Sequence, residues 1–271
     1  MPRDLRIWFA GGFILFLIIV AVFAPLLAPF DPLEQDLMAA TAAPGVEPGH
    51  WLGTDSLGRD VLSRLIYGTR IALTVAFVAA ILACLLGTTL GLLAGYYRGW
   101  VDSGVSRLVD IWMAFPPVLL SILLVAVLGA GLTSVIVAIV VIDWTRFARV
   151  VRAETLQQSR LEYAEAAAAL GMGRGAILVR EVLPNVLPVV VVLLSLEMGI
   201  AVIVEAILSF VGLSVSTDTP TWGGMIAEGR QIIYQAWWVL VFPLASLFLT
   251  VLAFNQLGDG LRQWLDPMLK R

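Results

Sequence analysis

Few side chains in this 271-residue chain could do covalent or metal chemistry. His50, Cys84 and Lys270 are each the one residue of their type. A zinc or di-metal centre draws on several His and Cys ligands, and a phosphate-binding loop needs a Lys directly after its glycines. The sequence therefore excludes both sites, and an intramolecular disulfide with them. We expect no catalytic residue, no metal site and no cofactor bound by this chain itself.

Three carboxylates lie inside long apolar stretches, at Asp143, Glu197 and Glu205. A charge at the centre of a bilayer costs about 2.5–3.5 kcal/mol, so these groups should face protein or a cavity. Glu197 and Glu205 are eight residues apart and would share one helix face. We predict that they line a translocation path; hydrogen bonding that fixes helix packing is the alternative. Asp143 precedes Arg146 by three residues, which favours a local ion pair.

The elements that carry these residues are predicted to be membrane helices. The chain is 60% hydrophobic and 14% charged, with a mean hydropathy of +0.94, whereas soluble domains are about 45–50% apolar and about 25% charged. Residues 7–30, 71–97, 111–142 and 231–258 carry no charge, and a crossing helix needs roughly 20 such residues. The net charge of −3 comes without a basic stripe, so no nucleic-acid partner is expected.

The composition predicts an all-α membrane protein with six transmembrane helices. The first is expected to be a retained anchor, because its apolar run is longer than that of a signal peptide and Pro25 follows the candidate cleavage site. A turn over Gly129–Ser134 would separate the third span from the fourth. The expected spans are Ile7–Leu27, Ile71–Gly95, Ile111–Gly129, Leu132–Ala148, Leu187–Val211 and Trp237–Leu257.

The basic residues predict the orientation of these spans. With six crossings and a cytoplasmic N-terminus, 13 of the 17 basic residues lie on the cytoplasmic side, as the positive-inside rule requires. A single span over 111–148 would place the arginines between Arg146 and Arg180 on the opposite side. We therefore expect both termini to be cytoplasmic. The basic residues left outside are Arg59, Arg64, Arg70 and Arg230.

Two connections on the external side are long enough to hold structure. The first, 28–70, is acidic in its first half and ends in a short helix, Val61–Tyr67, whose apolar face should lie on the membrane surface; a solvated loop is the alternative. We divide the chain after this connection, into an N-terminal anchor with its loop (1–70) and a permease core of five helices (71–271). The second connection, 212–236, contains an amphipathic stretch. Its expected membrane-interface anchors are Trp222, Trp237 and Trp238.

The second expected span carries a repeated glycine. Gly87, Gly91 and Gly95 recur every four residues and therefore lie on one face of a helix. Small residues at this spacing allow another helix to approach closely. We expect a tight helix–helix contact along this face.

The cytoplasmic segment Arg146–Pro184 is predicted to hold two helices with a sharp bend between them. Thr155–Leu170 is rich in alanine and other helix formers. Gly171 ends that stretch, where a positive φ is commonly needed, and Ala176–Val182 forms a second short helix. Pro184 stands where a new helix can start. Such a unit suits docking to another protein; an alanine-rich solvated helix is the alternative.

The same segment carries a family resemblance. Glu165-Ala166-Ala167, Gly171 and Leu183-Pro184 stand at the spacing of the EAA…G…LP loop of ATP-binding-cassette (ABC) importer permeases. One residue departs from that pattern: Glu181 stands two places before Leu183, where the family has an apolar side chain. Four further stretches resemble the second, C-type permease of dipeptide, oligopeptide and nickel importers. They are Leu52–Arg64, Leu208–Leu213, Pro220–Gly229 and Asn255–Arg262.

The resemblance implies a type I ABC importer permease in the inner (cytoplasmic) membrane of a bacterium or archaeon. Its implied partners are a homologous second permease, two cytoplasmic ATPases that bind ATP and magnesium, and an external solute-binding protein. By match of motif, the loop at about 150–184 would couple transport to the ATPases, through Glu165, Ala166, Ala167, Gly171, Leu183 and Pro184.

The function implied is half of a translocation path for di- or oligopeptides that works by alternating access. The alternative from another class is a proton-coupled secondary transporter of small solutes. In that case Glu197, Glu205 and Asp143 would form a proton relay.

Overall fold

The structure is a computed structural model that describes residues 3–215 and 219–265. The described residues form helices joined by loops, with one isolated β-bridge between Thr54 and Asp60. An all-helical fold is thus confirmed for this part of the chain. The α-helices are α1 (Arg3–Val22), α2 (Ala24–Leu27), α3 (Val61–Tyr97), α4 (Gly99–Met113), α5 (Pro117–Leu128), α6 (Leu132–Gln158), α7 (Glu162–Ala169), α8 (Arg174–Ile177), α9 (Leu183–Phe210), α10 (Trp222–Gln231) and α11 (Trp238–Leu265). A 3₁₀ turn (Leu37–Ala39) and a π-helical turn (Leu178–Val182) complete the set.

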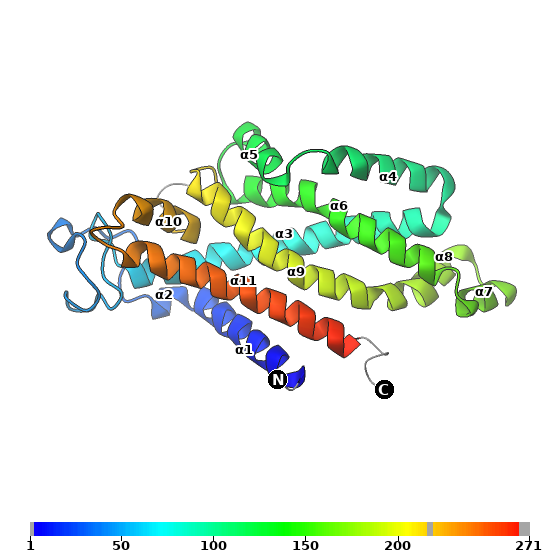
Figure 1. The fold of residues 1–271 in the computed structure, drawn as a ribbon, viewed down its shortest axis with the longest axis horizontal. Coiled ribbons are helices and arrows are strands. Elements are labelled where there is room, and N and C mark those ends of the chain that lie inside the picture. Colours follow the sequence, from blue (N-terminus) through cyan, green and yellow to red (C-terminus); the bar gives the residue numbers. More distant parts are fainter. Residues whose placement is uncertain (1–2, 216–218, 266–271) are drawn as a thin grey trace.

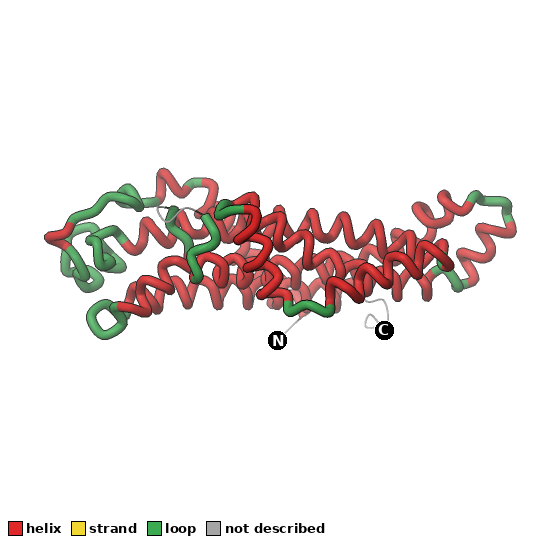
Figure 2. The backbone as a smooth tube through the Cα atoms, turned by 90° about the horizontal axis from the view of Figure 1, so that it is seen from above, coloured by secondary structure: helices red, strands yellow, loops and turns green. Residues whose placement is uncertain are grey.

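The long helices lie side by side along one axis of an elongated bundle (Figure 1). The loop 28–60 and α10 gather at one end, and α7 and α8 project at the other; a view from above shows the same separation (Figure 2). We call these the α10 end and the α7 end. Helix α3 is central, packing on α6, α9 and α1, while α11 packs between α9 and α1.

Within the described part of the chain, three helices are long and apolar enough to cross a membrane: α3, the continuous helix Arg174–Phe210, and α11. Helices α4 and α5 would add a fourth crossing if they are taken together, although they meet at a bend of 88°. The apolar run of α1, Arg6–Val22, is shorter. In α6 the first charge comes at Asp143, halfway along the helix. The six crossings stay a prediction.

The third expected span, Ile111–Gly129, is wrong as a single helix. Helix α4 ends at Met113 and α5 begins at Pro117. Proline lacks a backbone donor, and the residue before it is disfavoured in the α conformation. Pro116-Pro117 therefore stops one helix and starts the next. The turn expected after this segment is confirmed, with φ of +88° at Gly129 and α6 beginning at Leu132.

The separate surface helix Val61–Tyr67 is also wrong, because these residues are the first two turns of α3. Asp60 caps this helix, its carboxylate accepting a hydrogen bond from the Ser63 backbone N–H at 2.7 Å. Val61 and Leu65 are buried in the main core rather than laid on a surface. Arg64 and Arg70, which precede the charge-free run 71–97, lie within the same unbroken helix of 37 residues.

The glycine repeat packs α3 on α6, as expected. A Cβ built on Gly87 would lie 2.2 Å from the Trp144 carbonyl oxygen, and one on Gly91 2.7 Å from that of Ala148. Side chains at these positions would force the two helices apart. Their contact therefore depends on glycine.

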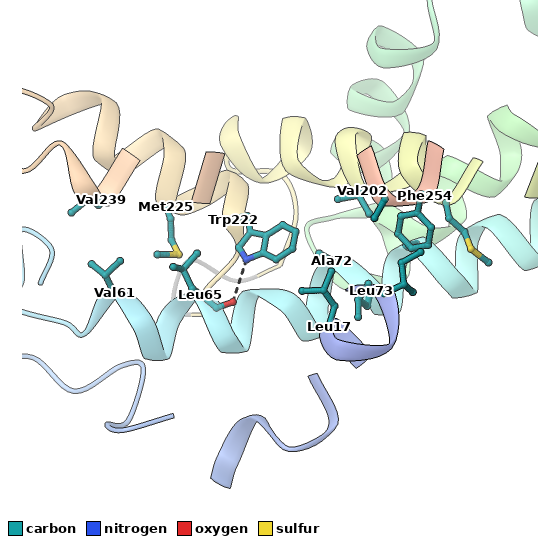
Figure 3. Packing of buried hydrophobic residues seen from close by; sticks show 14 of the residues in the cluster. Leu17, Val61, Leu65, Ala72, Leu73, Val202, Trp222, Met225, Val239 and Phe254 are labelled. Atoms are coloured by element: carbon teal, nitrogen blue, oxygen red, sulfur yellow. Dashed lines mark hydrogen bonds between the residues drawn. The ribbon is translucent and has the colours of Figure 1, made fainter. Parts of the chain in front are cut away.

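Two of the three expected interface tryptophans are core residues instead. Trp222 is 1% exposed and donates its indole N–H to the Leu65 carbonyl at 3.2 Å, which ties α10 to α3 (Figure 3). Trp238 is 5% exposed and donates to the Thr54 carbonyl at 3.0 Å. Trp237 is half exposed. Tryptophan suits a core as well as an interface when its N–H finds an acceptor, and here two of them do.

Candidate coupling and path sites

Helix α7 carries the first half of the predicted coupling motif at the far tip of the bundle (Figure 1). Ala164 and Ala167 are buried and belong to a core cluster with residues of α3, α6 and α9. Glu165 and Ala166 are exposed. One face of α7 is therefore fixed to the bundle, while the opposite face presents a carboxylate and small side chains.

The helix expected over Thr155–Leu170 is interrupted, since α6 ends at Gln158 and α7 begins at Glu162. The Ser159 hydroxyl donates to the Leu156 carbonyl at 3.2 Å, a local bond that competes with helix continuation. Tyr163 fixes the new direction by donating its hydroxyl to Gln158 Oε1 at 2.8 Å. Burial raises the pKa of Tyr163, so this hydroxyl stays protonated and able to donate.

Gly171 ends α7 in the left-handed conformation that its type predicts, with φ of +83°. The Met172 N–H donates to the Ala167 carbonyl at 3.1 Å and the Gly171 N–H to that of Ala168 at 3.0 Å. This pair of bonds is a Schellman motif, which favours glycine at this position. A Cβ built on Gly171 meets no atom within 4 Å. The glycine is therefore needed for its conformation and not for space.

Leu183 and Pro184 open α9, as expected, but the chain before them is already helical. Residues 174–210 form one continuous helix that contains the π turn. Pro184 cannot donate to the Arg180 carbonyl, and such a gap is accommodated by π turns. The Asn185 side chain supplies a donor nearby, reaching the Glu181 carbonyl at 2.7 Å. Glu181, the departure from the family pattern, is half-buried at this turn.

The three acids predicted to lie in membrane spans have different partners. Arg146 lies 3.8 Å from Asp143 on its own helix and 3.5 Å from Glu197, and the contact with Glu197 joins α6 to α9. The local pair expected between Asp143 and Arg146 is therefore confirmed, with Glu197 added. Glu197 is 2% exposed, and its Oε1 has no hydrogen-bond partner among the described residues.

Glu205 has different partners from Glu197. It is 1% exposed and accepts hydrogen bonds from the hydroxyls of Ser209 (2.5 Å) and Ser214 (3.1 Å). Both serines lie at the end of its own helix or just beyond it. These bonds satisfy a buried carboxylate locally. They favour the packing alternative for Glu205, while a path role for either acid stays a prediction.

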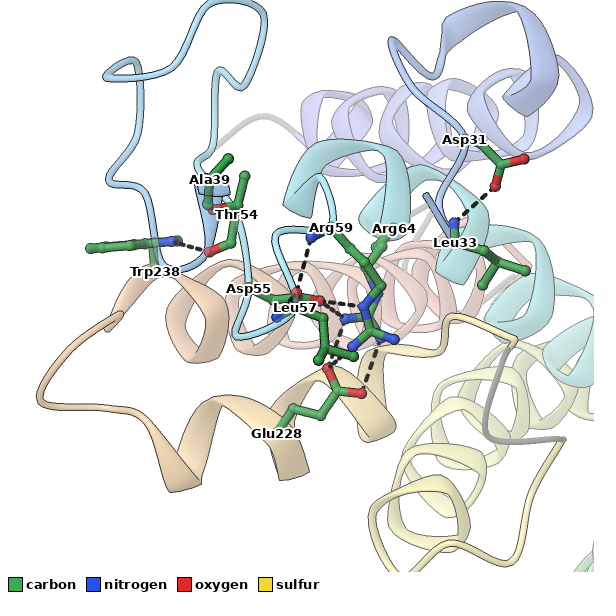
Figure 4. A network of polar contacts seen from close by, with 10 residues as sticks. All are labelled: Asp31, Leu33, Ala39, Thr54, Asp55, Leu57, Arg59, Arg64, Glu228 and Trp238. Atoms are coloured by element: carbon green, nitrogen blue, oxygen red, sulfur yellow. Dashed lines mark hydrogen bonds and ion pairs between the residues drawn. The ribbon is translucent and has the colours of Figure 1, made fainter. Parts of the chain in front are cut away.

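A polar network that the sequence does not predict lies at the α10 end (Figure 4). Asp55 begins a tight turn, accepting from the backbone N–H groups of Leu57 (2.8 Å) and Arg59 (3.0 Å). That turn brings Arg59 and Arg64 onto the same carboxylate. Both arginines also reach Glu228 of α10, at 2.9 Å and 2.7 Å.

This network is almost entirely buried. The exposed fraction is 0% for Asp55, 7% for Arg59 and 3% for Arg64, while the side chain of Glu228 is 34% exposed. Two arginines against two carboxylates balance their charge, which buried ions require. The residues come from Leu52–Arg64 and Pro220–Gly229, two stretches singled out in the sequence. Nothing in the sequence indicates that these two stretches lie close together.

A known protein family matches most of the chain. The family model described as "Binding-protein-dependent transport system inner membrane component" covers residues 87–271, which include α6 to α11. The chain belongs to this family. A second model, "N-terminal TM domain of oligopeptide transport permease C", matches residues 7–44 of the permease.

Curated relatives agree with this assignment over nearly the full permease. The glutathione transport system permease protein GsiD of Pectobacterium atrosepticum is 44% identical over 96% of this chain and 86% of its own. The dipeptide transport system permease protein DppC of Alkalihalophilus pseudofirmus is 42% identical over 93% of this chain and 83% of its own. The predicted resemblance is thereby confirmed. The chain is a membrane permease subunit of a binding-protein-dependent ABC importer.

Solved structures share the fold. The MetNI methionine ABC transporter, in inward-facing conformations, gives a TM-score of 0.63 at 23% identity, over 75% of this chain and 96% of the other. An amino acid ABC transporter gives 0.59 at 17% identity, over 75% and 95%. At these identities the likeness establishes the fold alone, that of a type I ABC importer permease.

Proposed function

We propose that this permease carries short peptides, with dipeptides and the tripeptide glutathione as the first cargoes to test. The observation that supports it is the relatives' identity of 42–44% over at least 93% of this chain, together with their names. Uptake of labelled dipeptide and of labelled glutathione is measured in cells that express the importer, with and without its solute-binding protein. Neither cargo accumulating above the permease-deleted background would contradict the proposal.

We propose that ATP, bound with magnesium by two cytoplasmic ATPases, drives this uptake. A homologous second permease and an external solute-binding protein would complete the importer. The lone Lys270 lies far from any glycine-rich turn, which supports a separate ATPase. Uptake into vesicles should depend on internal ATP and persist when a protonophore collapses the proton gradient. If collapsing the proton gradient abolishes uptake while internal ATP is present, the proton-coupled alternative is favoured.

We propose six crossings of the inner membrane, with both termini and the α7 end in the cytoplasm. The distribution of 13 basic residues against four supports this orientation. Reporters fused after Gly171 should read as cytoplasmic, and those fused after Leu213 as external. A cytoplasmic reading at Leu213 would overturn the topology. The division into 1–70 and 71–271 also stays a prediction. Its boundary falls inside α3, which runs through residue 70.

We propose that the exposed face of α7 docks on an ATPase and transmits its motion. What supports it is the combination of a buried face, Ala164 and Ala167, with an exposed face that carries Glu165 and Ala166. Small side chains let another protein approach closely. A Glu165→Cys variant should form a disulfide with a cysteine placed on the ATPase surface that receives α7. Equal cross-linking from a cysteine at Arg107 on α4 would contradict specific docking.

We propose that Glu197 acts in the translocation path through its link with Arg146. Glu197 Oε1 accepts no hydrogen bond from a described donor, and the Asp143 carboxylate lies beside Glu197. Buried acceptors are otherwise satisfied, so this arrangement supports a role beyond packing. Glu197→Gln should lower uptake while the complex still assembles. Glu205→Gln on the same helix is the comparison, and it should lower uptake less, since the local serine partners of Glu205 favour a packing role. Equal uptake by wild type and Glu197→Gln, at equal expression, would leave only the packing role.

A further inference from the structure

A groove of about 530 Å³ lies between α1 and α11 and belongs to none of the sites described above. Its walls come from one face of each helix, Arg6 to Phe13 on α1 and Leu249 to Gln256 on α11. In each helix the lining positions recur at three- and four-residue spacing, which aligns them along the axis. The groove therefore extends parallel to the axes of the two helices.

The floor and the rims of this groove differ in size. Ala10 and Ala253 form the floor and are 6% exposed each. Phe9 is 69% exposed and Leu252 41% exposed, and they stand as the rims. Two small residues between large apolar ones leave room for an elongated apolar group. Both helices carry apolar runs, so this face suits contact with lipid.

One end of the groove is polar. Arg6 is exposed and makes no ion pair with any described side chain, and the Gln256 side chain makes no hydrogen bond with one. Ile7 packs against Gly260 beside them, where an added Cβ would lie 2.4 Å from Ile7 Cγ1. This contact holds α1 and α11 together at the polar end. The groove thus joins a cationic head site to an apolar channel.

We propose that the groove binds one anionic phospholipid, from the leaflet in which α1 begins. The phosphate would pair with the Arg6 guanidinium, which offers several donors in a planar fork. Gln256 would donate to a phosphate or ester oxygen, and an acyl chain would lie over Ala10 and Ala253. The seven residue-to-residue steps of helix from Arg6 to Phe13 rise about 10 Å. This length fits within one leaflet of a hydrocarbon core about 30 Å thick.

The test uses the importer purified with the subunits that accompany this chain, in nanodiscs of phosphatidylcholine. A trace of phosphatidylglycerol with a photoactivatable acyl chain is added, and cross-linked peptides are mapped by mass spectrometry. Adducts should concentrate on residues 6–13 and 249–256. Arg6→Gln should lower this labelling about five-fold, because one basic side chain near anionic lipid contributes about 1 kcal/mol. Labelling by photoactivatable phosphatidylcholine should stay unchanged.

The matched control is Arg262→Gln, which removes the same charge from the exposed end of α11 outside the groove. It should leave labelling by phosphatidylglycerol at the wild-type level. Ala10→Leu fills the floor and should lower labelling by both lipids. Equal losses in Arg6→Gln and Arg262→Gln would mean general surface attraction and overturn the proposal. Adducts elsewhere, or disulfide cross-links from Phe9→Cys to the second permease, would overturn it too.

Discussion

At the α10 end, Asp55, Arg59 and Arg64 are each less than a tenth exposed and pair with one another and with Glu228. At the α7 end, Glu165 is exposed, and the helix that carries it is fixed by two small buried alanines. Both ends contain a motif found in the sequence. The charged residues of the motif at the α10 end form ion pairs with one another and with Glu228. Glu165, at the α7 end, forms no ion pair with a described side chain.

The comparison separates charge that builds the fold from charge offered to a partner. Buried ions must be paired, because desolvation of an unpaired ion costs several kcal/mol. An exposed carboxylate costs little and stays available. Substitutions at the α10 end should therefore act on stability, and substitutions at the α7 end should act on transport.

The largest loss of stability is expected from Arg64→Gln. This change leaves Asp55 and Glu228 to share Arg59, and breaking a buried pair costs about 3–5 kcal/mol. The melting temperature of the purified complex should fall by several degrees. Arg107→Gln, which removes an exposed charge from α4, is the matched control and should keep the melting temperature of the wild type. Identical melting of both variants would mean that the network contributes nothing to stability.

Gly58→Ala should come next, with Gly171→Ala as its counterpart at the α7 end. Both glycines have positive φ, +75° and +83°, which costs a substituted residue about 1–2 kcal/mol. A Cβ on Gly58 would also lie 1.8 Å from the Asp36 carbonyl oxygen, whereas one on Gly171 meets nothing within 4 Å. We expect the free energy of unfolding to fall by about 3 kcal/mol in Gly58→Ala and by about 1 kcal/mol in Gly171→Ala. Equal melting temperatures would contradict this ranking.

The same contrast shows what could be predicted from the sequence. Gly171 at the end of an alanine-rich helix and the glycine repeat of α3 depend on residues near in sequence, and both predictions are confirmed. The contact between Arg64 and Glu228 joins residues 164 positions apart, for which local spacing carries no signal. For the same reason the sequence predicts Trp222 at the membrane interface, because its acceptor on Leu65 lies 157 residues away.

Gly171→Val should cost at least the ~1 kcal/mol of unfolding free energy expected for Gly171→Ala, and it should have a clear effect on transport. The β-branched residue disfavours the left-handed conformation, so the end of α7 should unwind or extend. No expected span contains Gly171, so membrane insertion should be unchanged. We expect ATP hydrolysis to continue in vesicles holding the complete complex while uptake falls. Uptake at the wild-type rate, with the ATPase bound, would show that this turn has no part in coupling.

The smallest effect on stability is expected from Glu165→Gln, and it gives the sharpest test of the comparison. Glu165 lies in the first turn of α7, where a carboxylate interacts with the helix dipole for about 0.3–1 kcal/mol. Glu162→Gln removes the same charge from the same exposed turn, outside the motif, so both variants should lose the same small stability. If α7 presents Glu165 to an ATPase, only Glu165→Gln should also lower the uptake supported by each ATP hydrolysed. Equal uptake per ATP in the two variants would mean that the α7 end, like the α10 end, uses its charge only for the fold.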